Sequence, residues 1–311
     1  TNSSNLPFSY ILRVPFTIDS NERIFIMKNR IFLTFVSALL VFSGVSASSN
    51  KSALAKETGL HRVSSSYINK IGLKSSYYRL NQNTKFSFAG NKVTLPKGTV
   101  LAASVSIDNG SKAKSGKALI SSHIDLSYAL KKRVGFNKPS QFIPILLSYY
   151  PSKYTRVKRP VYVLPYGENV LYSGGIGTFK TRASNYFYNP HFSSNALKIT
   201  SDGYLEFYKY HHKPLADGGL NWQYVQKPTS YVKISHTLKQ GSKTFIYYQH
   251  KLQGVRATHL NKGKYRYRLT INNQHTPYQY TGRIYAMWAS LYTVGGAKYF
   301  TPPQNAANYG D

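Results

Sequence analysis

The first candidates for catalysis are two acidic residues close together in the sequence. Asp202 and Glu206 lie four positions apart, on either side of a glycine. A glycosidase needs two carboxyl groups roughly 5–9.5 Å apart. On an extended strand these two would be about 13 Å apart, and Asp202 also begins a typical Ser-Asp-Gly turn. Another acid would have to complete the pair, so Glu206 and its alternative partner Glu168 are the candidates for a cell-wall glycan hydrolase.

The other reactive residue types form no pattern typical of a cofactor or metal site. The chain has 9 histidines and no cysteine. The adjacent pair His211-His212 would point to opposite faces of a strand, which makes joint chelation difficult. The run 174–177 (GGIG) is not followed by Lys-Ser, Lys-Thr or a helix-type pattern, and we interpret it as a turn. We therefore expect no cofactor, no metal and no cysteine nucleophile.

Tyrosine next to lysine or arginine is the strongest signal of contact chemistry. The chain has 28 tyrosines. Their rings and hydroxyls suit sugars or bases, and the basic residues suit phosphate. If 264–268 is a strand, Tyr265 and Tyr267 share one face and the basic residues share the other. The alternative is that most tyrosines fill half-buried strand faces. The candidate polyanion-binding or glycan-binding residues are Tyr208, Lys209, Tyr210, Lys264, Tyr265, Arg266, Tyr267 and Arg268.

Short β-prone segments separated by turn residues predict an all-β mature chain of small barrel or sandwich modules. One short helix is predicted at 127–134, and Pro144 argues against a central strand in 142–150. The turns at 95–98, 238–241 and 260–263 share the pattern Leu-x-(Lys/Gln)-Gly, which predicts hairpins with glycine in the left-handed conformation. The predicted strands are 77–80, 85–88, 92–95, 99–107, 119–124, 161–163, 169–172, 204–210, 231–235, 244–250, 264–271 and 283–291.

These segments group into two predicted modules. Residues 67–150 form the first β module, and 161–300 form a second, Tyr-rich β module. The proline-flanked basic segment 151–160 is the predicted boundary, and 301–311 is a tail.

Residues 27–47 have the three parts of a helical secretory signal peptide. Two basic residues precede the uncharged, mostly apolar run 31–45. That run is shorter than the about 20 residues that a membrane-spanning helix needs. Small residues allow cleavage after Ala47 or, alternatively, after Ala55. We expect the mature protein to be secreted, without an integral membrane anchor.

The segments on either side of the signal peptide carry no β pattern. A signal peptide normally begins a chain, so residues 1–26 are expected to be upstream-translated sequence. Residues 48–66 are rich in serine, lysine and alanine and are predicted to be a linker.

The charge of the chain predicts a negatively charged partner. There are 41 lysines and arginines against 10 acidic residues, a net charge of +31. Such an excess attracts polyanions. Secretion without disulfides is common in Gram-positive bacteria, whose nearest extracellular polyanion is the cell wall with its teichoic acids.

Two segments carry a resemblance to known proteins. Residues 77–80 (YYRL) and 92–100 (KVTLPKGTV) are similar to small SH3-like wall modules, in which a strand leads through a Lys-Gly turn into another strand. The composition resembles that of the basic, Tyr- and Lys-rich surface-layer and surface-layer-associated proteins of lactic-acid bacteria. This resemblance implies attachment to the wall.

The sequence therefore predicts a secreted, non-enzymatic protein, extracellular or loosely associated with the cell wall. Its expected partner is an anionic, teichoic-acid-like wall polymer, with carbohydrate as a further ligand class. Two alternatives stay open: the glycan hydrolase, and an extracellular nucleic-acid-binding protein.

Overall fold

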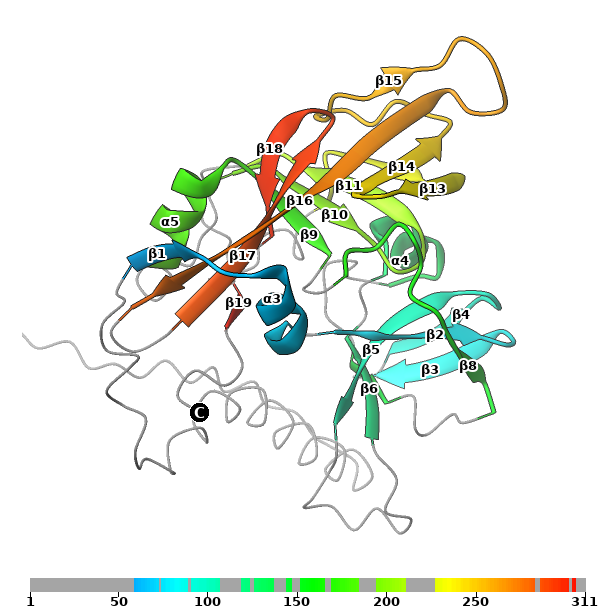
Figure 1. The fold of residues 1–311 in the computed structure, drawn as a ribbon. Helices are drawn as coiled ribbons and strands as arrows, with labels where there is room; N and C mark the ends of the chain where they lie inside the picture. Colours follow the sequence, from blue (N-terminus) through cyan, green and yellow to red (C-terminus); the bar gives the residue numbers. More distant parts are fainter. Residues whose placement is uncertain are drawn as a thin grey trace, which may run out of the picture. The chain divides into compact units, whose positions relative to one another are not determined.

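The described part of the chain is mostly β-strand with few helices, which confirms the predicted all-β class (Figure 1). The protein is represented by a computed structural model. It describes residues 59–72, 74–88, 91–106, 119–123, 126–136, 144–146, 152–165, 169–184, 194–210, 227–282, 286–301 and 304–305. The predicted signal peptide, both cleavage positions Ala47 and Ala55, and Glu168 lie outside these residues.

Most of the described strands belong to one antiparallel sheet. Its main path runs β12-β11-β10-β9-β18-β17-β16-β14-β13, with three short strands pairing beside it. The strands are β1 (Gly59–Arg62), β9 (Val170–Ser173), β10 (Ala196–Ile199), β11 (Tyr204–Tyr208), β12 (Ser230–Lys233), β13 (His236–Gln240), β14 (Lys243–Tyr248), β15 (Thr258–His259), β16 (Tyr267–Thr281), β17 (Ala286–Val294), β18 (Ala297–Phe300) and β19 (Gln304–Asn305).

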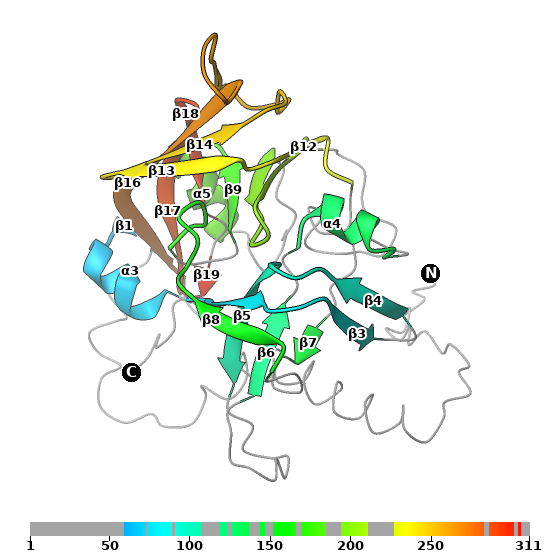
Figure 2. The same ribbon diagram turned by 90° about the vertical axis from the view of Figure 1, so that its right-hand side faces the viewer.

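The long strand β16 connects the parts of this sheet (Figures 1 and 2). Its first half pairs with β14 and β15, and its last residues pair with β1. Its register with β17 shifts between Asn273 and Pro277, as at a β-bulge. The first half of β16 therefore positions side chains against β14 and β15, where the candidate site lies.

A second sheet has the order β7-β6-β5-β2-β8. Its strands are β2 (Ser76–Leu80), β5 (Val100–Ser106), β6 (Leu119–His123), β7 (Pro144–Leu146) and β8 (Tyr154–Val157), and β3 (Thr84–Phe88) pairs with β4 (Asn91–Leu95) as a separate hairpin. The proline strand β7 is at the sheet edge, where the missing N–H is tolerated. Gly98, in the turn between β4 and β5, has a φ of +84°, as predicted from the Leu-x-Lys-Gly pattern.

Within the described ranges, three helices interrupt the strands: α3 (Ser65–Ile71), α4 (Tyr128–Arg133) and α5 (Ile176–Ser184). The predicted helix at 127–134 is thus confirmed as α4. The interpretation of 174–177 as only a turn is wrong, because α5 begins at Ile176 directly after the two glycines.

The predicted linker and the predicted boundary both contain strands. Residues 59–62, assigned to the linker, form β1 and pair with Tyr278–Thr281 of β16. The boundary segment contains β8, which pairs with β2. Residues 161–163 form a turn and not a strand, with the N–H of Val163 donating to the carbonyl of Pro160.

The core includes side chains from both predicted modules. Tyr77 and Val100 of the second sheet belong to the same buried cluster as Leu171, Leu197 and Leu205 of the large sheet. All described residues fall in one compact unit. The segment 151–160 therefore does not separate two independent cores.

Candidate anion-binding surface

The two acidic residues first considered for catalysis lie at the start of α4. The carboxylate of Asp202 accepts hydrogen bonds from the backbone N–H of Ser127 (2.9 Å) and from its hydroxyl (2.6 Å). The carboxylate of Glu206 accepts from the backbone N–H of Tyr128 and from the hydroxyl of Tyr208, the latter at 2.7 Å. The first N–H groups of a helix have no partner within the helix, so both acids cap α4 from outside. We call Ser127, Tyr128, Asp202, Glu206 and Tyr208 the carboxylate cluster.

Glu206 is fully buried in this cluster. Its side chain is 1% exposed, and Lys198, its cross-strand partner on β10, is 2% exposed. Burial raises the pKa of Glu206, and Lys198, the N–H of Tyr128 and the hydroxyl of Tyr208 oppose that rise. These contacts use the carboxylate to hold α4 against β11, a structural role.

The prediction that residues 208–210 contact a ligand is wrong for Tyr208. The ring of Tyr208 is 4% exposed, because β11 is buried on both faces. Lys209 is exposed and Tyr210 is half-buried. A contact surface centred on Tyr208 is therefore not formed.

A different face of the large sheet combines aromatic and basic side chains. Residues directly opposite one another on neighbouring strands share a face, so the register defines three rows across β13, β14 and β16. We call this the outer face, because its residues are half-buried or exposed while the alternating residues Ile246, Tyr248, Leu269 and Ile271 are buried. The rows are His236, Tyr247 and Arg268; Leu238, Phe245 and Thr270; and Gln240, Lys243 and Asn272.

Three rings gather at one end of the outer face. His236 stacks on Tyr265 with an interplanar angle of 3° and a centroid distance of 5.7 Å. Tyr247 lies 5.7 Å from His236 and 5.5 Å from Tyr265. The ammonium group of Lys264 is 5.9 Å from the centroid of Tyr265. The rings form a compact aromatic cluster beside Arg268.

The predicted arrangement of 264–268 is only partly correct. The strand begins at Tyr267, so Lys264, Tyr265 and Arg266 precede it. Tyr265 joins the outer face, whereas Tyr267 stacks on the buried Tyr248 at 5.8 Å. The two tyrosines do not share a face, because the chain leaves the strand ladder between them.

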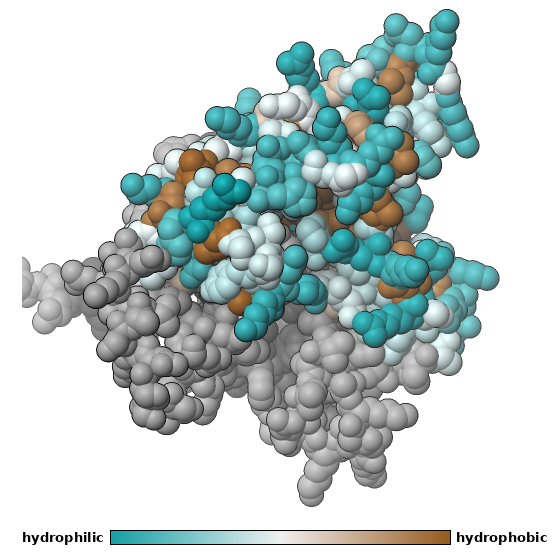
Figure 3. Space-filling model, in the orientation of Figure 1, coloured by the Kyte–Doolittle hydropathy of each residue, from teal (hydrophilic) through white to brown (hydrophobic). Residues whose placement is uncertain are grey.

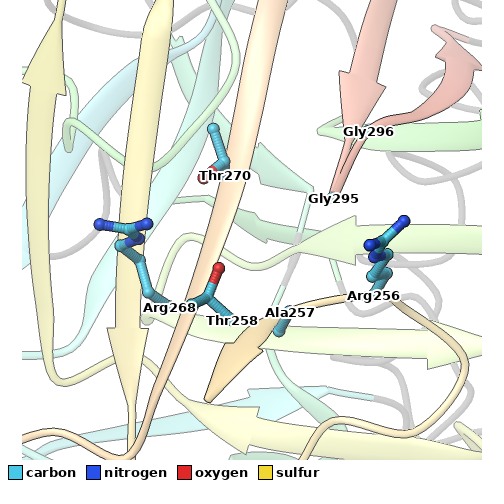
Figure 4. Close-up of a pocket in the computed structure, with 7 residues that line it drawn as sticks. All are labelled: Arg256, Ala257, Thr258, Arg268, Thr270, Gly295 and Gly296. Carbon is cyan, nitrogen blue, oxygen red and sulfur yellow. The ribbon is translucent and has the colours of Figure 1, made fainter. Parts of the chain in front are cut away.

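A pocket of about 410 Å³ opens beside this face, lined by Arg256, Ala257, Thr258, Arg268, Thr270, Gly295 and Gly296. Figure 4 shows Arg256 and Arg268 on opposite sides of the pocket, with Thr258 and Thr270 between them. Thr258 is the cross-strand partner of Arg268 on β15. The guanidinium carbon of Arg268 lies 5.3 Å from the ring centroid of Phe245. Its Nε atom is buried and has no hydrogen-bond partner among the described residues.

The pocket belongs to a stretch without negative charge. Residues 218–310 contain twelve lysines and arginines and no aspartate or glutamate. Hydrophilic side chains dominate the described surface over β13, β14 and β15, with scattered apolar patches (Figure 3). An anion at this surface would meet donors and positive charge without a competing carboxylate.

Most pocket residues were not predicted from the sequence. Arg268 was, but Arg256, Thr258, Thr270 and the Gly295-Gly296 pair come from three separate segments. The one sequence signal for this pocket was the Gly295-Gly296 pair between two β-prone runs, because such a pair predicts a tight hairpin.

No three His, Asp or Glu side chains among the described residues gather as a metal site would require. None of the described helices is long and apolar enough to cross a membrane. The chain matches no family model, no curated protein and no solved structure.

Proposed function

We propose that this is a secreted, non-enzymatic cell-surface protein that binds an anionic, teichoic-acid-like polymer of the cell wall. The outer face and its pocket are the contact surface. The observation that carries the proposal is the acid-free composition of 218–310, combined with the aromatic cluster and Arg268 on one face of the sheet. Cations supply long-range attraction to phosphate, and rings and hydroxyls supply short-range contacts to sugar or polyol.

Cell fractionation tests this function. Cells producing the protein are separated into medium, salt wash and wall, and the protein is expected in the salt wash. Exposed charge contacts are screened within about 10 Å at 0.1 M salt and within about 3 Å at 1 M, so molar salt should release it. Retention on the wall through molar salt would rule out electrostatic attachment.

The glycan-hydrolase alternative depends on Glu206 or Glu168. Glu206 is buried and its carboxylate is occupied by α4, which favours the structural role. A zymogram on purified walls tests the alternative directly: clearing by the wild type that is lost in Glu206→Gln would support the enzyme.

A further inference from the structure

We infer that the pocket formed by Arg256, Thr258, Arg268 and Thr270 binds one phosphodiester group of a polyol-phosphate polymer. This inference rests on the proposed function, which by itself needs only a diffuse positive surface. It adds a defined subsite with a geometry of its own.

The pocket contains the donors that a phosphate group requires. An arginine side chain carries five N–H donors in a planar fork that fits phosphate oxygens, and a threonine hydroxyl donates one more. Arg256 and Arg268 stand on opposite sides of the pocket, and Thr258 and Thr270 lie between them (Figure 4). In Figure 4 the two guanidinium groups point away from each other. A phosphodiester has two non-bridging oxygens, and both arginines reach them once their side chains turn toward the threonines.

The guanidinium of Arg268 packs against an aromatic ring at the edge of the pocket. Its guanidinium lies over the ring of Phe245, a contact that leaves the N–H groups at its edge available. Its Nε is a buried donor without a partner among the described residues. Burying a donor without an acceptor costs about 1–3 kcal/mol, and an anionic oxygen that reaches Nε would offset that cost.

The backbone keeps the pocket open. Gly295 and Gly296 join β17 to β18 with φ values of +56° and +89°, as a two-residue type I′ turn requires. A Cβ atom on Gly295 would collide with the backbone carbonyl of Arg256. Glycine therefore lets the Arg256 segment approach the hairpin closely and form the pocket wall.

The surroundings favour a polyol phosphate over a nucleic acid. The volume of about 410 Å³ is within the range of small-molecule sites, roughly 300–1,000 Å³, and leaves room for polyol beside the phosphate. Single-stranded nucleic acid binds to free ring faces on which successive bases stack. Here His236, Tyr247 and Tyr265 pack against one another, so they do not form such a row.

The experiment measures binding of a defined oligo(glycerol phosphate) to the purified protein at fixed salt. Arg268→Gln and Arg256→Gln are compared with Arg156→Gln, which removes the same charge from an exposed arginine of β8. Loss of a charge-assisted hydrogen bond should weaken binding about tenfold or more in each pocket variant. The control should change binding by less than about threefold, as expected for an exposed charge.

Arg268→Lys sharpens the test, because it keeps the charge and loses the planar fork. Binding as weak as in Arg268→Gln supports the pocket, and wild-type binding overturns it. Unchanged thermal unfolding midpoints show that each variant folds. Thr258→Val, at an exposed position of β15, is the second pocket variant if Arg268 variants unfold.

Two further ligands define the remaining outcomes. Equal binding of polyglutamate at matched charge would overturn the phosphodiester assignment, and tighter binding of single-stranded DNA at matched phosphate would reassign the pocket to nucleic acid. Equal losses in the Arg156 and pocket variants would remove the subsite and leave charge-driven wall binding intact. Absence of wild-type binding to intact walls would instead remove the proposed function.

Discussion

The carboxylate cluster and the outer face are built from similar residues and have opposite surroundings. Each combines tyrosines with ionisable side chains on strands of the same sheet. In the carboxylate cluster, Glu206 and Tyr208 are buried and bonded to each other, and Glu206 also accepts from the N–H of Tyr128 in α4. On the outer face, Tyr247, Tyr265 and Arg268 are half-buried, and residues 218–310 contain no acid.

The decisive difference between the two regions is whether the polar groups already have partners. Asp202 and Glu206 are the only acids among the described residues, and the carboxylates of both accept hydrogen bonds at the start of α4. Removing a buried group that is already bonded leaves its partners unsatisfied, whereas cations without nearby acids remain available for a ligand. Substitutions should therefore affect folding in the first region and binding in the second.

The largest expected effect is the loss of stability in Glu206→Ala. This change removes the acceptor for Tyr128 and Tyr208 and the negative charge opposite Lys198. Breaking a buried charge pair by removing one partner costs about 3–5 kcal/mol of unfolding free energy. Lys264→Ala, at an exposed position beside the aromatic cluster, should stay within about 0.5 kcal/mol of the wild type. Urea unfolding followed by circular dichroism measures both unfolding free energies. Similar losses of stability in the two variants would contradict the assignment of a folding role to the carboxylate cluster and a binding role to the outer face.

A matched pair of hydroxyl deletions comes next. Tyr208→Phe removes the 2.7 Å hydrogen bond to Glu206, and a bond to a charged group contributes about 1.5–3 kcal/mol. Tyr265→Phe keeps the ring that stacks on His236 and should change the unfolding free energy by less than about 0.5 kcal/mol. The same unfolding assay compares them. A larger loss for Tyr265→Phe would reverse the roles of the two regions.

The pH dependence of stability offers a third comparison. Burial raises the pKa of Glu206 above its ordinary value of 4.5, so the folded protein keeps this proton to higher pH than the unfolded chain. This group therefore lowers the unfolding free energy as pH rises from 4.5 through the folded-state pKa. Glu206→Gln cannot ionise and should lack that fall.

The measurement is the difference in unfolding free energy, wild type minus Glu206→Gln, from below pH 4.5 to neutral pH. It should decrease with rising pH. An increase would mean that attraction to Lys198 outweighs the cost of burial, and the carboxylate would then act as a stabilising charge.

The sequence could predict many of the strands and one helix, because turn residues and β-prone runs are local signals. Gly98 is an example, since its left-handed conformation follows from the turn pattern. The burial of Tyr208 was not predictable from alternation, because β11 is covered on both faces by parts of the chain far away in sequence. The start of α5 after Gly175 also has no preceding local pattern.

The candidate site shows the same limit. Arg268 was selected because basic and aromatic residues alternate around it. Arg256 and Thr258 reach the pocket only because β15 pairs with β16, and Gly295 only because β17 does. Single-sequence patterns do not specify such pairings between distant segments.

The smallest expected effect distinguishes the two segments that the sequence predicted to bind a ligand, 208–210 and 264–268. Lys264→Gln removes an exposed charge beside the aromatic cluster, and Lys209→Gln removes one at the end of the buried strand β11. A contact with one exposed charge contributes roughly 0.2–1 kcal/mol, so Lys264→Gln should weaken binding to purified walls by up to about fivefold at low salt. The loss should disappear at 1 M salt, where the interaction between exposed charges is screened beyond about 3 Å. Lys209→Gln should bind like the wild type at every salt concentration. Equal losses in both variants would mean that the wall is bound by the net charge of the whole molecule, and the outer face would have no special role.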